Sequence, residues 1–161
     1  MPTTYPAPKD HAIEALLGGL VSVPSHVTRA QVADPERDAR GLFAEFVTDN
    51  DELAVLAFAD HDVVNFVGGA MVGHDVEALQ EAGSKATLVD EGVEGFREVV
   101  NVFPSCLNCD FTPHLRLANV HLLPAQLQDE VKQLWRQPRG RRAYRVAVDD
   151  YGAGMMILYF G

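Results

Sequence analysis

Two polar side chains three residues apart are the first candidates for chemistry in this chain of 161 residues. Glu98 and Asn101 belong to a row that also contains Glu94 and Ser105, with steps of four, three and four residues. Residues three or four apart on an α-helix project side by side. A helix here would therefore present the carboxylate of Glu98 and the carboxamide of Asn101 together to whatever docks on it. An ordinary solvated helix face has the same spacing, so the pattern alone leaves both interpretations open.

Apolar residues predict the helix that would carry this row. They recur in steps of four and three and, at about 100° per residue, stack into one narrow stripe nearly opposite the polar row. The stripe consists of Val89, Val93, Phe96, Val100, Phe103 and Leu107. The prediction is a long helix from about Asp90 to Asn108, buried on one side and exposed on the other. Pro104 lies inside this range, and an interior proline tends to kink or break a helix. We therefore expect an end or a bend near Phe103.

The sequence EVVN at residues 98–101 matches the ExxN signature of the CheC/CheX family of chemotaxis phosphatases. In that family the signature sits on a long helix, and a small polar or acidic residue precedes it by four positions, as Glu94 does here. The segment GGAMVG at residues 68–73 is similar to the family's apolar helix closed by Met-x-Gly. The resemblance covers roughly residues 41–161. Because only one ExxN occurs, the chain resembles the single-site CheX type.

The resemblance implies a phosphatase that hydrolyses the aspartyl phosphate of a CheY-type response-regulator receiver. Phosphoryl transfer to water depends mainly on positioning and on charge stabilisation. In this interpretation Asn101 holds the attacking water and Glu98 pairs with the receiver's active-site lysine, so both are catalytic. Glu94 and Ser105 would contact the partner. The chain would need no cofactor and no metal site, because Mg²⁺ is expected on the receiver. CheX-type proteins are typically homodimers, which is the expectation here.

The alternative is a catalytically degenerate relative, which would bind a receiver or a flagellar switch component without turnover. Two departures from the family favour it. Pro104 stands where the family's helix continues, and Ser105 replaces the glycine that usually follows the Asn by four residues. Whether the chain is an enzyme therefore stays open at this point.

The remaining elements predict an α+β fold, with a mixed, largely antiparallel sheet and long helices packed on it. We expect one CheX-like domain over residues 1–161, in which residues 1–40 are the least defined. Strands are predicted within 21–32 and at 42–47, 53–58, 115–122, 144–148 and 155–160. The turn residues at 49–51 and 149–152 predict that 42–47 pairs with 53–58, and 144–148 with 155–160, as two hairpins. Helices are predicted after the capping residues Asp10 and Asp60, and a short helix or ordered loop at 126–135. The stretch 76–86 is predicted to be looser.

Two further features constrain the packing of these elements. The last strand, residues 155–160, is so apolar that it should be central or pair with a second copy, because an open apolar edge invites aggregation. Gly68 and Gly69 each cost a helix interior about 1 kcal/mol. Their presence indicates close backbone packing against a neighbour, or an early helix end.

Composition excludes some functional classes. The formal charge is −10, which argues against a nucleic-acid binder and would steer a basic partner toward the chain. No apolar run approaches the roughly 20 residues of a membrane span, and residues 1–9 show no signal-peptide pattern, so we expect a cytoplasmic protein. Five of the 13 basic residues lie between Arg136 and Arg145, where a solvated loop and strand start is the simplest interpretation.

The two cysteines form a CxxC pair, Cys106 and Cys109, with His114 nearby. Such a pair can be redox-active or supply half of a zinc site. A closed zinc site needs four ligands, and the sequence contains no second CxxC or histidine pair. Leu107 falls on the apolar stripe, and free cysteines often behave as small apolar residues. We therefore assign this pair no metal.

Overall fold

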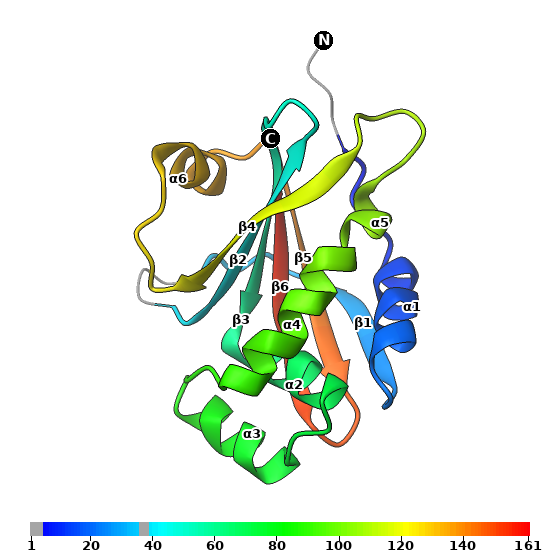
Figure 1. Ribbon diagram of the computed structural model, residues 1–161, viewed down its shortest axis with the longest axis vertical. Helices are drawn as coiled ribbons and strands as arrows, with labels where there is room; N and C mark the ends of the chain where they lie inside the picture. Colours follow the sequence, from blue (N-terminus) through cyan, green and yellow to red (C-terminus); the bar gives the residue numbers. More distant parts are fainter. Residues whose placement is uncertain (1–4, 36–38) are drawn as a thin grey trace.

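The computed structural model describes residues 5–35 and 39–161, and within these ranges the chain forms six helices and six strands (Figure 1). The helices are α1 (Asp10–Leu20), α2 (His61–Met71), α3 (Val76–Ser84), α4 (Asp90–Val102), α5 (Pro104–Leu107) and α6 (Asp129–Arg136). The strands are β1 (Ser25–Ala30), β2 (Gly41–Thr48), β3 (Leu53–Asp60), β4 (Leu115–Leu123), β5 (Gly140–Val148) and β6 (Gly152–Phe160).

One sheet joins all the described strands in the order β1-β5-β6-β3-β2-β4, and every neighbouring pair is antiparallel. This confirms the predicted α+β fold, although no parallel pair occurs among the described strands. The apolar strand β6 is central, between β5 and β3, and its last five residues are buried. Its edges are therefore already paired within the chain. The outer strands of the sheet are β1 and β4.

The two faces of the sheet carry separate apolar clusters. Alternate residues of β6 show this, because Leu158 packs with the cluster under α1, α2 and α4, whereas Ile157 and Tyr159 pack with the cluster under α6. Figure 1 shows α6 standing apart from the other helices. Trp135 of α6 contacts Phe43 edge-on, with ring centroids 5.0 Å apart. Both faces of the sheet are thus covered in part.

Both predicted hairpins form, with the residue types that such turns require. Asp51, between β2 and β3, has a φ of 62°, and Asp150, between β5 and β6, has a φ of 68°. Aspartate tolerates this left-handed conformation better than most residues. The strand predicted within 21–32 is β1, and the short helix predicted at 126–135 is α6.

Two local predictions need correction. Residues 76–86 are not loose, because they contain α3. This helix was not predicted because only one of its side chains, Leu79, is buried, so its sequence has no apolar repeat. Asp10 is not a cap, because it is the first residue of α1 and Lys9 precedes it as the N-cap. Asp60 does cap α2 as predicted, since its Oδ1 accepts a 2.9 Å hydrogen bond from the backbone N–H of Val63.

Helices α2 and α4 meet backbone to backbone. A Cβ atom added to Gly68 would lie 1.8 Å from the carbonyl oxygen of Gly92, and one added to Gly95 would lie 2.2 Å from the carbonyl oxygen of Gly68. Real Cβ atoms cannot approach so closely, so only glycine fits at these positions. The close packing predicted for Gly68 is confirmed, and its partner is α4. Among the described helices, none is long and apolar enough to cross a membrane.

Replacing Gly68 by alanine should destabilise the protein strongly, because the added methyl group can be accommodated only if α2 and α4 separate. We expect a loss of about 3 kcal/mol in the free energy of unfolding, measured by urea denaturation. Gly19→Ala is the matched control, since nothing lies within 4 Å of a Cβ atom at this position of α1. It should leave stability unchanged or raise it by up to about 1 kcal/mol. Equal effects of the two substitutions would contradict this account of the contact.

Candidate functional site

Helix α4 presents the polar row to solvent and the apolar stripe to the core. Glu94, Glu98 and Asn101 are exposed on α4, and Ser105 is exposed on α5. The residues of the predicted stripe are buried, except that Val89 is only half-buried. The two-faced character predicted from the spacing is confirmed. The catalytic and partner-binding roles of these side chains remain predictions.

The helix is interrupted after Glu98 and Asn101, as the position of Pro104 led us to predict. The long helix is divided into α4, which ends at Val102, and α5, which begins at Pro104. Phe103 between them keeps a helical conformation, with φ −57° and ψ −30°, and its backbone N–H donates to the carbonyl oxygen of Val99 over 2.9 Å. Proline at the first position of a helix is favourable, since its missing N–H has no partner there anyway. Asn101 therefore keeps its helical place beside Glu98.

A shallow hollow of about 450 Å³ lies beside Glu98, where the end of α2 meets α4. We call it the α4 hollow, and its lining residues are Met71, Val72, Glu94, Gly95, Arg97 and Glu98. Among the described residues, neither Glu98 nor Asn101 forms a side-chain hydrogen bond or an ion pair. Both side chains are therefore available to an incoming molecule.

A buried asparagine fixes the start of α4. Asn65 of α2 is fully buried, and its Nδ2 donates to the carbonyl oxygen of Thr87 over 2.7 Å. Its Oδ1 accepts a 2.9 Å hydrogen bond from the backbone N–H of Val89. The segment that enters α4 is thus tied to α2. The sequence analysis did not detect this residue, although a lone amide among the apolar residues 63–67 would have been the indication.

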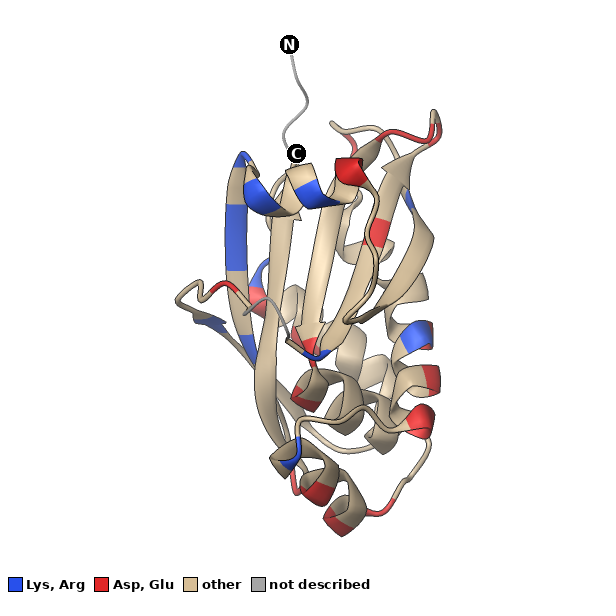
Figure 2. Ribbon diagram, turned by 90° about the vertical axis from the view of Figure 1, so that its left-hand side faces the viewer, with Lys and Arg blue, Asp and Glu red and all other residues tan. Residues whose placement is uncertain are grey.

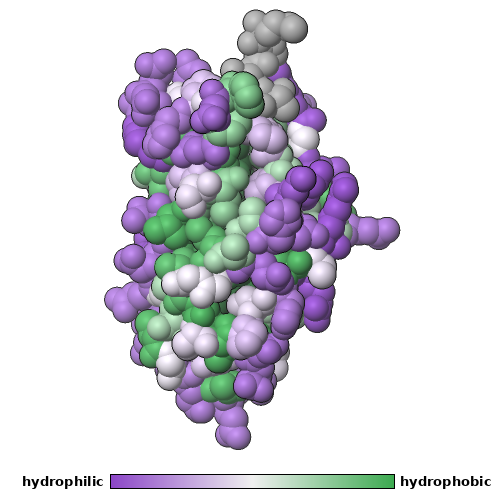
Figure 3. All heavy atoms as spheres, turned by 90° about the vertical axis from the view of Figure 1, so that its right-hand side faces the viewer, coloured by the Kyte–Doolittle hydropathy of each residue, from purple (hydrophilic) through white to green (hydrophobic). Residues whose placement is uncertain are grey.

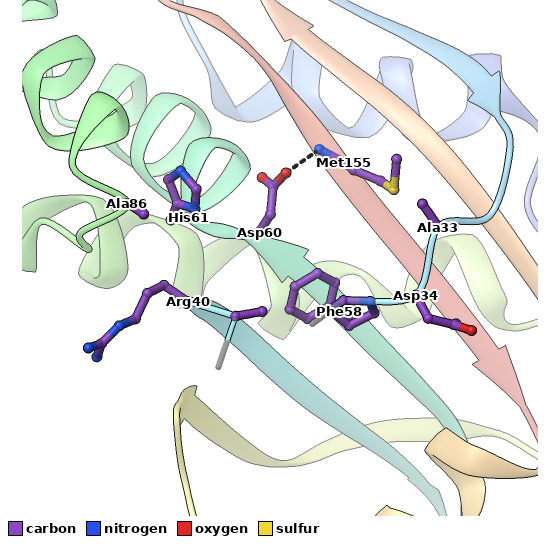
Figure 4. Close-up of a pocket in the computed structure, with 10 residues that line it drawn as sticks. Ala33, Asp34, Arg40, Phe58, Asp60, His61, Ala86 and Met155 are labelled. Atoms are coloured by element: carbon purple, nitrogen blue, oxygen red, sulfur yellow. Dashed lines mark hydrogen bonds between the residues drawn. The ribbon is translucent and has the colours of Figure 1, made fainter. Parts of the chain in front are cut away.

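A second cavity lies elsewhere, where the segments around β1 and β2 approach the start of α2 (Figure 4). It measures about 480 Å³ and includes the carboxylate of Asp60. Both carboxylate oxygens are engaged: Oδ1 caps α2, and Oδ2 accepts a 2.8 Å hydrogen bond from the backbone N–H of Met155. Burial, partly offset by these bonds, raises the pKa of Asp60. This carboxylate holds structure together, so we place no reaction there.

The two cysteines take separate partners. Cys106 Sγ lies 3.7 Å from the carbonyl oxygen of Ala12, and Cys109 Sγ lies 3.3 Å from Thr112 Oγ1. Within residues 5–35 and 39–161, no group of three or more His, Cys, Asp or Glu side chains could hold a metal ion.

Part of the arginine-rich segment lies on the α6 side of the sheet: Arg141 and Arg145 share the β5 face of Ala143, whereas Arg142 is on the face of Tyr144. Arg136 ends α6, and Figure 2 shows basic residues along β5 and α6. Arg141 Nη1 donates to both carboxylate oxygens of Asp34, each over 2.8 Å. This pair fixes the segment after β1 against β5, and both partners are exposed, so its contribution to stability is small.

No protein-family model matches the sequence, and no curated protein shows significant sequence similarity to it. Solved structures do match. FliM of H. pylori, in its complex with SpeE, matches with a TM-score of 0.61 at 6% identity, over 94% of this chain and 80% of that chain. FliY of Thermotoga maritima matches with a TM-score of 0.50 at 8% identity, over 96% of this chain and 85% of that chain.

A third match is the CheX–CheY–BeF₃–Mg complex of Borrelia burgdorferi, with a TM-score of 0.43 at 9% identity, over 92% of both chains. This likeness is too weak to carry an argument. The FliM and FliY matches show that the chain shares the fold of those proteins. Identities of this size show the fold alone.

Replacing Asn65 by alanine should weaken the attachment of α4, because it removes the hydrogen bonds that the side chain makes to the carbonyl group of Thr87 and to the N–H group of Val89. A typical hydrogen bond contributes about 0.5–1.5 kcal/mol, so we expect a loss of about 2 kcal/mol in the free energy of unfolding. Asn101→Ala is the matched control, because Asn101 is exposed, and it should change stability by less than about 0.5 kcal/mol. A large loss in the control, or none at Asn65, would refute this assignment.

Proposed function

We propose that this chain is a CheX-like phosphatase that hydrolyses the aspartyl phosphate of a CheY-type receiver in chemotaxis or two-component signalling. The observation that carries the proposal is the pair Glu98 and Asn101, which lie exposed and side by side on α4. The fold shared with FliM and FliY is compatible with this role. So is the position of the helix break, which follows Asn101 and leaves the ExxN turn helical. Such a role would belong in the cytoplasm.

Each side chain suits a distinct part of this reaction. The carboxamide of Asn101 can accept from and donate to one water molecule, and so can hold it in line with the phosphorus atom. The water oxygen then forms a bond to phosphorus while the bond from phosphorus to the receiver's aspartate breaks. The aspartate leaves as a carboxylate, and the proton of the water ends on the released phosphate. Glu98 would pair with the receiver's lysine and fix the register of docking.

The rest of the chemistry would be supplied by the substrate. Mg²⁺ on the receiver would neutralise the charge that develops on the phosphoryl oxygens, so this chain would need no cofactor of its own. Glu94 and Ser105, one turn to either side, would contact the receiver. The packing of α4 supports such positioning, because the glycine contact and Asn65 hold the helix before any partner arrives. Little conformational freedom would then be lost on docking.

A second candidate is a module that binds a receiver or a flagellar switch component without turnover. Ser105 favours it, because it departs from the family's glycine one turn after Asn101. The FliM structure with the TM-score of 0.61 was solved as a complex with another protein, SpeE, which also favours a binding role. In either case we expect a homodimer, as in CheX-type proteins, and β1 and β4 are the outer strands that a second copy could reach.

The test is the decay of phosphorylated CheY-type receivers from the same cell, with and without the protein. We expect faster decay, and a loss of about 100-fold in this acceleration for both Glu98→Ala and Asn101→Ala, since each removes a positioning contact. Glu130→Ala and Asn119→Ala are matched controls, because both residues are exposed and lie on other elements, α6 and β4, and they should keep the acceleration.

The outcomes separate the two candidates. Acceleration that survives Asn101→Ala would contradict the role assigned to that residue. A phosphorylated receiver that binds tightly without decaying faster would instead favour the binding module.

A further inference from the structure

Two exposed apolar side chains lie at the two ends of the Glu98–Asn101 pair. Val72, directly after α2, is 54% exposed and shares the α4 hollow with Glu98. Val102, the last residue of α4, is 37% exposed and follows Glu98 by one helical turn. Single exposed apolar residues are common on protein surfaces. These two differ because both adjoin Glu98, Val72 across the α4 hollow and Val102 one helical turn along α4.

The surroundings of the hollow indicate what kind of group would fit it. Glu94 and Glu98 lie one turn apart, and like charges at this spacing disfavour a helix slightly. Arg97 also lines the hollow, but no described cation lies within ion-pair distance of either carboxylate. The lining thus combines two unpaired carboxylates and one guanidinium group with the apolar side chains of Met71 and Val72, so its net charge is negative. A long cationic side chain suits it, because its methylene stem can lie on apolar surface while its charged end meets a carboxylate.

Apolar surface is not confined to this hollow. Figure 3, which looks onto the side of the molecule where α1 lies in Figure 1, shows a band of apolar surface between hydrophilic margins. Partly buried side chains on α1 and α2 contribute apolar area next to the core, among them Leu16, Leu20 and Met71. Apolar surface of this kind, edged by polar residues, is typical of protein–protein contacts.

We propose that Val72 and Val102 are the apolar contact points through which this chain docks its receiver. The stem of the receiver's active-site lysine would lie on Val72 while its ammonium group meets Glu98. An apolar side chain beside the receiver's phosphorylation site would pack on Val102. This inference rests on the proposed function, because it takes the receiver as the occupant. It adds residues that no motif contains, and it assigns them to binding rather than to the chemical step.

The experiment measures the binding of CheY-type receivers from the same cell, each activated with beryllofluoride and Mg²⁺. Val72→Ser and Val102→Ser should each raise the dissociation constant about tenfold, since each removes one apolar contact at the centre of the interface. In turnover assays their effect should appear in KM more than in kcat. Val72→Leu keeps an apolar side chain at this position and should bind as tightly as the original chain. Weak binding by Val72→Ser alone would then reflect the lost apolar contact.

Val32→Ser and Leu122→Ser are the matched controls. Both residues have a similar exposed fraction, 37% and 38%, and lie outside the polar row and the α4 hollow. They should change the dissociation constant by less than about twofold, as near-neutral positions do. Equal weakening in these controls would show a general effect of lost surface hydrophobicity and would overturn the proposal.

The failures of the two proposals are distinguishable. If Val72→Ser and Val102→Ser bind an activated receiver as tightly as the original chain, while Asn101→Ala abolishes turnover, the docking surface is wrong and the phosphatase assignment stands. If no activated receiver binds the original chain at all, both are wrong.

Discussion

The backbone contact between α2 and α4 is the constraint on which the candidate site depends. Three glycines, Gly68, Gly92 and Gly95, let the two helices approach without side chains between them. Because α2 packs on the sheet and α4 packs on α2, the outward face of α4 is fixed relative to the whole molecule. Asn65 adds a second attachment where α4 begins. A polar pair on such a helix is held in place by packing, which is what a positioning role requires.

Pro104 shapes the site by where it ends the helix. If the helix had continued without a break, Cys106 and Cys109 would have followed the polar row along the same helix. Instead α4 ends at Val102, and the short helix α5 places Cys106 Sγ 3.7 Å from the carbonyl oxygen of Ala12 in α1. The thiols are thereby directed to structural contacts, away from Glu98. Pro104 cannot donate the helical hydrogen bond to the carbonyl oxygen of Val100, but residues 98–101 stay within α4, and the N–H of Phe103 still bonds the carbonyl oxygen of Val99.

The sequence predicted the features that depend on periodicity, and it missed those that depend on distant pairing. Alternation and turn residues predicted both hairpins, and the apolar stripe predicted the two faces of α4. Helix α3 was missed because it buries one side chain, Leu79, and one side chain makes no period. Asn65 was missed because its partners are backbone groups 22 and 24 residues away. The place of Val72 beside Glu98 likewise follows from how α2 and α4 cross, which no local pattern contains.

The distribution of charge adds an orientation to this site. The chain is acidic overall, yet Arg136, Arg141 and Arg145 belong to α6 and to the α6 side of β5. Helices α3 and α4 carry mainly acidic residues, and Figure 2 shows red segments on the helices away from α6. Charges more than about 8 Å apart are largely screened at physiological salt, so the arginines cannot neutralise a field on the opposite side of the sheet. A basic partner would therefore be attracted first to the helical side, where the α4 hollow and the exposed apolar residues lie.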